Sequence, residues 1–93
     1  MEDRSAIHAR VYGLVQGVGF RYYTQNVARK YGLKGWVRNN PDGSVEVVAE
    51  GTAGAVQHME EFLHTGPPHA QVSQVEVRRP AYQGLFKSFS VEF

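Results

Sequence analysis

The first recognisable pattern in the chain is an alternation of apolar and polar residues near the N-terminus. Ile7, Ala9 and Val11 alternate with polar positions, as in a strand that buries one face. After a glycine-containing segment, apolar side chains recur at steps of three and four residues from Phe20 to Tyr31, and the glycine that follows suits a helix C-cap. The chain therefore opens with a predicted strand followed by a predicted helix.

Two strand-like runs come next, at residues 34–39 and 43–51. They are joined by Asn40-Pro41-Asp42-Gly43, whose proline and Asp-Gly pair are turn formers. Such a short connection predicts a hairpin with antiparallel strands.

The second half of the chain predicts one helix and two strands. Thr52 can cap the helix, and Gly66-Pro67-Pro68 ends it near His64 because proline cannot continue the helical ladder. A fourth strand is indicated at residues 75–77, and apolar positions alternate again at residues 89–93 as a short last strand. The stripe of the helix comprises Val56, Met59, Phe62 and Leu63.

This order of elements, βαββαβ with one additional strand, predicts an α+β fold. Two strand-helix-strand units joined by a hairpin form a ferredoxin-like sandwich, in which both helices cover one face of an antiparallel sheet. The expected organisation is a single domain spanning residues 1–93, with a short extra C-terminal strand and with residues 1–5 disordered.

Composition narrows the classes of function. The chain has no cysteine, which excludes disulfides, thiolate catalysis and zinc-thiolate sites. Its formal net charge of +1 does not support a general polyanion binder. No signal peptide or membrane anchor is recognisable, so we expect a cytoplasmic protein without a membrane partner, and a monomer is the simplest expectation.

Candidate chemistry lies between the first strand and the first helix, in a segment we call the glycine loop (residues 15–20). Gly17 and Gly19 let the backbone approach a ligand closely, and Arg21 follows in the first helical turn. Free N–H groups at a helix start and an arginine fork both favour an anion such as phosphate. The pattern is neither a Walker A motif nor a Rossmann fingerprint, so a purely structural turn stays open on spacing alone.

The exact residue order of two segments is more informative than the presence of two glycines. Val15-Gln-Gly-Val-Gly-Phe-Arg21 and Gly35-Trp-Val-Arg-Asn39 resemble, in order and separation, the two signature segments of the acylphosphatase family. Further similarity is found at Asp42-Gly-Ser-Val-Glu46, Gly66-Pro67, Ala70-Gln71-Val72 and Phe89-Ser90-Val91, so the resemblance covers the chain from Ala6 to Phe93.

The resemblance implies hydrolysis of a small-molecule acyl phosphate without a metal or organic cofactor. It implies that Arg21 holds the phosphate and that Asn39 orients the attacking water. The backbone amides of the glycine loop would form a cradle for the phosphate; they belong to Gln16, Gly17, Val18, Gly19 and Phe20. Since the leaving carboxylate has a conjugate acid with a pKa of about 4, no general acid is required.

Other interpretations of the same residues remain. Arg21 could be solvated, and Asn39 competes with Asn40 for a simple role in the turn. A metal site is disfavoured because no two histidines have helical i, i+4 spacing; the histidines are His8, His58, His64 and His69.

Two alternative functions are a nucleic-acid binding module and a non-catalytic interaction domain. Tyr12 and Trp36 on an open sheet face could stack bases, but the run Ser44-Val-Glu-Val-Val-Ala-Glu50 is acidic and lacks an RNP1 signature. The interaction domain would resemble the one at the front of the carbamoyltransferase that matures hydrogenases. That protein continues into further domains with zinc-binding cysteines, which this sequence lacks.

Overall fold

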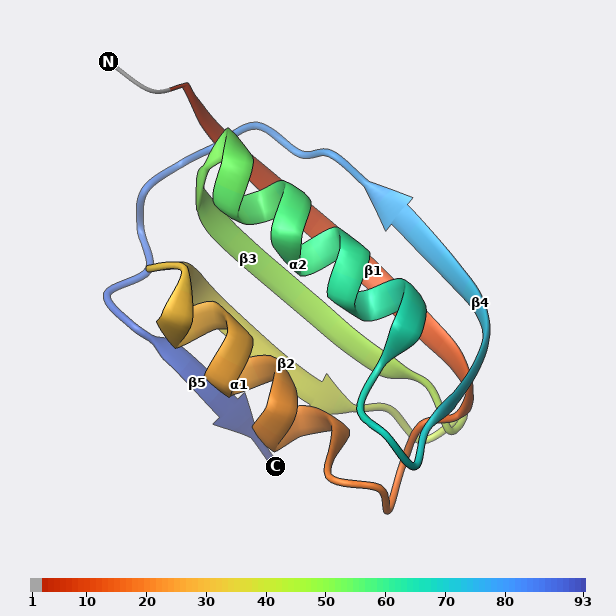
Figure 1. Ribbon diagram of the computed structural model, residues 1–93. Helices are drawn as coiled ribbons and strands as arrows, with labels where there is room; N and C mark the ends of the chain where they lie inside the picture. Colours follow the sequence, from red (N-terminus) through yellow and green to blue (C-terminus); the bar gives the residue numbers. More distant parts are fainter. Residues whose placement is uncertain (1–2) are drawn as a thin grey trace.

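Two helices cover one face of a five-stranded sheet in the computed structural model, which describes residues 3–93 (Figure 1). The strand order across the sheet is β4-β1-β3-β2-β5. The predicted α+β, ferredoxin-like fold is confirmed. In chain order the elements are β1 (Arg4–Leu14), α1 (Phe20–Lys30), β2 (Lys34–Asn39), β3 (Val45–Thr52), α2 (Ala53–Thr65), β4 (Gln71–Arg78) and β5 (Phe89–Glu92).

The four strands of the ferredoxin-like unit pair antiparallel, as predicted, whereas the additional strand β5 lies parallel to β2. The chain leaves β4 at one edge of the sheet and crosses to the opposite edge before β5 begins (Figure 1). Glu50 holds part of this crossing segment, because its carboxylate accepts the backbone N–H groups of Gln83 and Gly84 at 2.9 and 3.0 Å. The complete sheet is therefore mixed.

The core lies between the sheet and the helices. The alternating residues Ile7, Ala9 and Val11 of β1 are buried, and Ala9 lies opposite Val47 of β3. From the helices, Phe20 and Phe62 meet with their ring centroids 5.8 Å apart. Burying these side chains is the main driving force for closing the helices over the sheet.

In the described part of the chain, no helix covers the other face of the sheet (Figure 1). Val37 is fully buried toward the helices, while Trp36 lies half-buried on the open face, as strand alternation requires. Arg38 also lies on this face and its guanidinium is 4.8 Å from the centroid of the Trp36 ring. Among residues 3–93, no helix is long and apolar enough to cross a membrane.

The N-terminal segment differs from the expectation that residues 1–5 are disordered. Arg4 and Ser5 belong to β1, where they lie opposite Thr52 and Gly51 of β3. The carbonyl of Asp3 accepts the N–H of Ala53 at 2.9 Å. Main-chain pairing with β3 orders this polar stretch, and such pairing leaves no trace in side-chain periodicity. Residues 1–2 lie outside the described part of the chain.

Candidate active site

The glycine loop has a backbone that suits an anion. Gly17 and Gly19 both have a φ of 76°. In the described chain only glycines have positive φ, so Gln16, Val18 and Phe20 beside them have negative φ. Alternation of this kind turns successive N–H groups toward one concavity, the arrangement called a nest. Since left-handed backbone costs a residue with a Cβ atom about 1–2 kcal/mol, the two glycines are needed at these positions.

The start of α1 adds to this positive concavity. Gly19 is the N-cap, so no side chain caps the first N–H groups, and the first turn contains no acidic residue. The last turn instead carries Arg29 and Lys30. Uncapped N–H groups at a helix start carry partial positive charge, and here that charge is not neutralised by the first turn.

A pocket of about 200 Å³ lies against the glycine loop and the start of α1. It brings Arg21 together with Asn39, the last residue of β2, although the two are far apart in sequence. Both side chains are half-buried. The complete lining is Val15, Gly17, Gly19, Phe20, Arg21, Tyr22 and Asn39.

The lining differs from the predicted site at four residues. Gln16 and Val18 were predicted to contribute backbone amides, but neither lines the pocket: Val18 packs against the core, and the Gln16 side chain reaches the β2–β3 connection. Val15 and Tyr22 line the pocket and were not predicted. Val15 begins the first signature segment and Tyr22 directly follows it, but nothing in the sequence indicated the direction of their side chains.

The structure separates Asn39 from its neighbour Asn40, which in the sequence only the family resemblance distinguishes. Asn40 belongs to the hairpin turn (residues 40–44), where its side-chain Nδ2 donates to Oγ of Ser44 at 3.1 Å. Asn39 lies one residue earlier, paired with Val45 of β3, and lines the pocket. Asn40 is thus engaged in the turn, and Asn39 is the amide available to a ligand.

The hairpin turn is braced by one carboxylate. Asp42 accepts both the backbone N–H and the hydroxyl of Ser44, at 2.9 and 2.6 Å. These hydrogen bonds from Ser44 hold the pKa of the Asp42 carboxyl below its ordinary value. The turn therefore presents a defined backbone beside Asn39.

Arg21 is oriented by the C-terminal strand. Its Nη1 donates to the carbonyl of Glu92 at 3.0 Å, and its guanidinium carbon lies 4.6 Å from the centroid of the Phe93 ring. The remaining N–H donors of the guanidinium stay in its plane and can face an anion. Sequence reasoning predicted Arg21 and a strand near residue 89 separately, but gave no signal that they meet.

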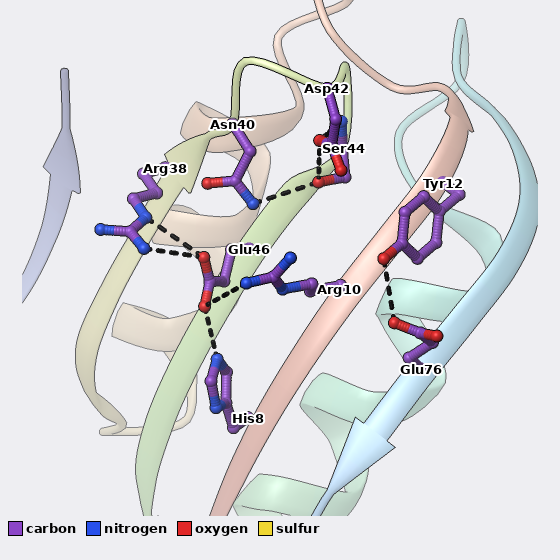
Figure 2. A network of polar contacts seen from close by, with 9 residues as sticks. All are labelled: His8, Arg10, Tyr12, Arg38, Asn40, Asp42, Ser44, Glu46 and Glu76. Atoms are coloured by element: carbon purple, nitrogen blue, oxygen red, sulfur yellow. Dashed lines mark hydrogen bonds and ion pairs between the residues drawn. The ribbon is translucent and has the colours of Figure 1, made fainter.

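A second polar cluster lies on the open face of the sheet, centred on Glu46 (Figure 2). The Glu46 side chain is only 4% exposed and accepts hydrogen bonds from His8 at 2.5 Å and from Arg38 at 2.9 and 3.2 Å. Arg10 lies 3.9 Å away. Burial raises the pKa of Glu46, but the hydrogen bonds from His8 and Arg38 outweigh it, so that the pKa lies below its ordinary value.

The open face has a different chemistry from the pocket. A buried carboxylate at its centre does not suit a nucleic-acid backbone, and Tyr12 is engaged with Glu76 through a 2.9 Å hydrogen bond. The histidines are dispersed: His8 contacts Glu46, and His58 stacks on Tyr31. Within the described chain, no group of three or more potential ligands is placed to hold a metal ion.

Comparisons with known proteins agree with the geometry. Residues 7–91 match the family model Acylphosphatase. The acylphosphatase of Thermococcus kodakarensis is 50% identical over 82 residues, which are 88% of this chain and 90% of that relative. The crystal structure of acylphosphatase from Bacillus subtilis superimposes with a TM-score of 0.91 at 38% identity, covering 96% of this chain and 99% of that one.

A longer protein contains the same fold. Full-length HypF, solved in a phosphate- and nucleotide-bound form, matches with a TM-score of 0.89 at 29% identity. The match covers 100% of this chain but 12% of HypF.

Proposed function

This chain belongs to the acylphosphatase family and hydrolyses acyl phosphates, and we propose that Arg21 holds the phosphate of the substrate while Asn39 orients the attacking water. The observation that carries this assignment is that Arg21 and Asn39 line the same pocket. The backbone N–H groups of the glycine loop and of the start of α1 complete the anion site. Of the cradle that the sequence predicts for residues 16–20, Gly17, Gly19 and Phe20 line the pocket.

The reaction needs little covalent chemistry from the protein. The water oxygen bonds to phosphorus as the bond from phosphorus to the carboxylate oxygen breaks, and the electron pair leaves with the carboxylate. A phosphate oxygen of the substrate accepts the proton of the water. Because a carboxylate is a good leaving group, no protein group has to protonate it.

Positioning and charge stabilisation then account for catalysis. A guanidinium and several N–H groups stabilise the charge on the transferred phosphoryl group, and an amide side chain fixes the water in line with the breaking bond. The proposed mechanism is metal-free and uses no organic cofactor. The pocket is small, which supports recognition of the acyl phosphate group with few contacts to the rest of the substrate.

We further propose that the chain acts as a single acylphosphatase-like domain, as a monomer and in the cytoplasm. The pocket that brings Arg21 and Asn39 together is formed by one chain and does not require a second copy. Size-exclusion chromatography with light scattering tests the monomeric state, and a stable dimer would contradict that state.

The experiment that tests the assignment is hydrolysis of benzoyl phosphate in the presence of EDTA, together with calorimetric binding of inorganic phosphate. Arg21→Ala should lower kcat/KM by about 10³-fold or more, the scale of an arginine in phosphoryl transfer, and should abolish phosphate binding. Asn39→Ala should leave phosphate affinity nearly unchanged and lower kcat by about 10²-fold.

Exposed residues on α1 supply matched controls. Arg29→Ala and Asn26→Ala remove the same side-chain types away from the pocket and should leave turnover unchanged. Full activity of Arg21→Ala would overturn the phosphate-binding role. A loss of phosphate affinity in Asn39→Ala, with kcat retained, would make Asn39 a binding residue instead.

A further inference from the structure

The side chain of Gln16 connects two parts of the active site that are distant in sequence. Its Nε2 donates to the backbone carbonyl of Asn40 at 2.8 Å and to that of Ser44 at 3.0 Å. Both acceptors belong to the hairpin turn, and Gln16 itself belongs to the glycine loop. Both N–H donors of this one amide group are thus engaged with a single turn.

The topology of the sheet explains why such a link is needed. The glycine loop follows β1, and Asn39 ends β2, but β3 lies between these two strands. Strands lie about 4.8 Å apart, so the two halves of the site start about 10 Å from each other. β1 and β2 each pair with β3 and not with each other, and the glycine loop lies beyond the end of β1, so no strand pairing holds the loop directly to Asn39. The Gln16 side chain makes that direct link.

The hairpin turn is a firm partner for this bridge (Figure 2). Asp42 accepts two hydrogen bonds from Ser44, and the N–H of Asn40 donates to the Ser44 carbonyl at 2.9 Å. The carbonyls that Gln16 contacts are therefore held in place by the turn itself. Asn39 precedes this braced turn directly, so that fixing the turn also fixes Asn39.

We propose that Gln16 is a positioning residue for acyl phosphate hydrolysis: its side-chain amide sets the distance between the glycine loop and Asn39. This inference rests on the proposed roles of Arg21 and Asn39. With the phosphate bound at the glycine loop and the water held by Asn39, the link places the water in line with phosphorus. A misplacement of about 1 Å in such an arrangement can cost 10²-fold in rate.

The chemistry of the link is specific to an amide. Gln16→Met keeps the length of the side chain and removes both donors. Gln16→Glu keeps the shape, but its carboxylate would face two carbonyl oxygens and repel them, so it should be the more damaging change. For Gln16→Met we expect kcat to fall by about 10- to 10²-fold, while the affinity for inorganic phosphate changes by less than about threefold.

The matched control is Gln25→Met. Gln25 also uses its Nε2 to hold a backbone carbonyl, that of Phe89 at 3.3 Å, but it ties α1 to β5 and does not touch the hairpin turn. Its kcat should stay within about twofold of the native value. An equal loss in both variants would reduce the role of Gln16 to general structural support and overturn the proposal.

The decisive test is a double-mutant cycle with Asn39→Ala on benzoyl phosphate. If Gln16 acts through Asn39, Gln16→Met lowers kcat in the native background and has little further effect when Asn39 is absent. Independent, additive losses would overturn the proposal, as would full turnover of Gln16→Met. Hydrogen exchange of the backbone N–H groups in the hairpin turn gives a readout without substrate, and it should speed up in Gln16→Met with little change in Tm.

These measurements distinguish a failure of the positioning role of Gln16 from a failure of the proposed role of Asn39. If Asn39→Ala loses turnover while Gln16→Met keeps it, the positioning role fails and the proposed function stands. If Asn39→Ala keeps full turnover, the proposed role of Asn39 fails, and the positioning role of Gln16 falls with it even where exchange in the turn speeds up.

Discussion

The guanidinium of Arg21 donates a hydrogen bond to the backbone carbonyl of Glu92, 71 positions later in the chain, at 3.0 Å. An arginine delivered by the first turn of α1 is therefore oriented by the last strand of the sheet. The ring of Phe93 lies against the same guanidinium. The additional strand β5 thus supports the site as well as extending the sheet.

Phe93→Ala should weaken phosphate binding without destabilising the fold. The ring is 93% exposed, so its removal costs little packing, but it ends a cation–π contact of about 0.5–1 kcal/mol that helps to orient Arg21. We expect KM to rise about two- to fivefold, with Tm unchanged. Leu85→Ala removes another strongly exposed apolar side chain and is the control; an unchanged KM in Phe93→Ala would mean that the ring does not orient Arg21.

Arg21→Lys should be strongly impaired although it keeps the positive charge. A lysine ammonium is a point charge and cannot reproduce the planar fork that bonds two phosphate oxygens while also donating to Glu92. We expect kcat/KM to fall by about 10- to 10²-fold, the value of one or two charge-assisted hydrogen bonds. Steady-state kinetics beside Arg29→Lys check this, and native activity of the lysine variant would refute the bidentate role.

Gly17→Ala should raise KM through the backbone alone. A Cβ atom at this position would meet nothing within 4 Å, so any effect comes from the φ of 76°. The strain of about 1–2 kcal/mol would be relieved by turning the loop N–H groups away from the phosphate. Gly32→Ala is the matched control, with a φ of 70° and equally open space. Both variants should lose similar stability in urea unfolding, but a raised KM is expected only for Gly17→Ala; equal KM values would contradict the nest.

Glu46→Gln should reduce stability and flatten its dependence on acid pH. The folded-state pKa of Glu46 lies below the ordinary value of 4.5, so the carboxylate stabilises the fold above that pH, and this contribution is lost as pH falls through the folded pKa. Its partners Arg38 and Arg10 are half exposed, which places the loss at pH 7 near the lower end of about 1–3 kcal/mol.

The measurement for this prediction is urea unfolding between pH 3 and pH 7. The native protein should lose stability below about pH 5 more steeply than Glu46→Gln. Glu61→Gln serves as control, since that side chain is 62% exposed on α2. Parallel curves for the native protein and Glu46→Gln would show that Glu46 does not account for the acid dependence.

Local patterns gave most of the elements. The strand at residues 34–39 has the predicted bounds, the first helix begins at Phe20, and Thr52 caps the second helix by accepting the N–H of Ala55 at 3.2 Å. These features depend on side-chain alternation, helical periodicity and capping, all of which act within a few residues. Other bounds moved. β4 spans Gln71–Arg78 and not only residues 75–77. β3 begins at Val45 and not at residue 43, because Asp42 holds Ser44 in the hairpin turn.

The sequence by itself determined the layered fold, the buried face of the first strand and the loop that delivers Arg21, because each depends on residues that are neighbours along the chain. Only the tertiary structure decided which residues meet at the pocket. The parallel pairing of β5 with β2, the contact of Arg21 with Glu92 and the link from Gln16 to the hairpin turn all join distant segments. Such contacts follow from the strand order and from the packing of the core. A local sequence pattern specifies neither the strand order nor the packing.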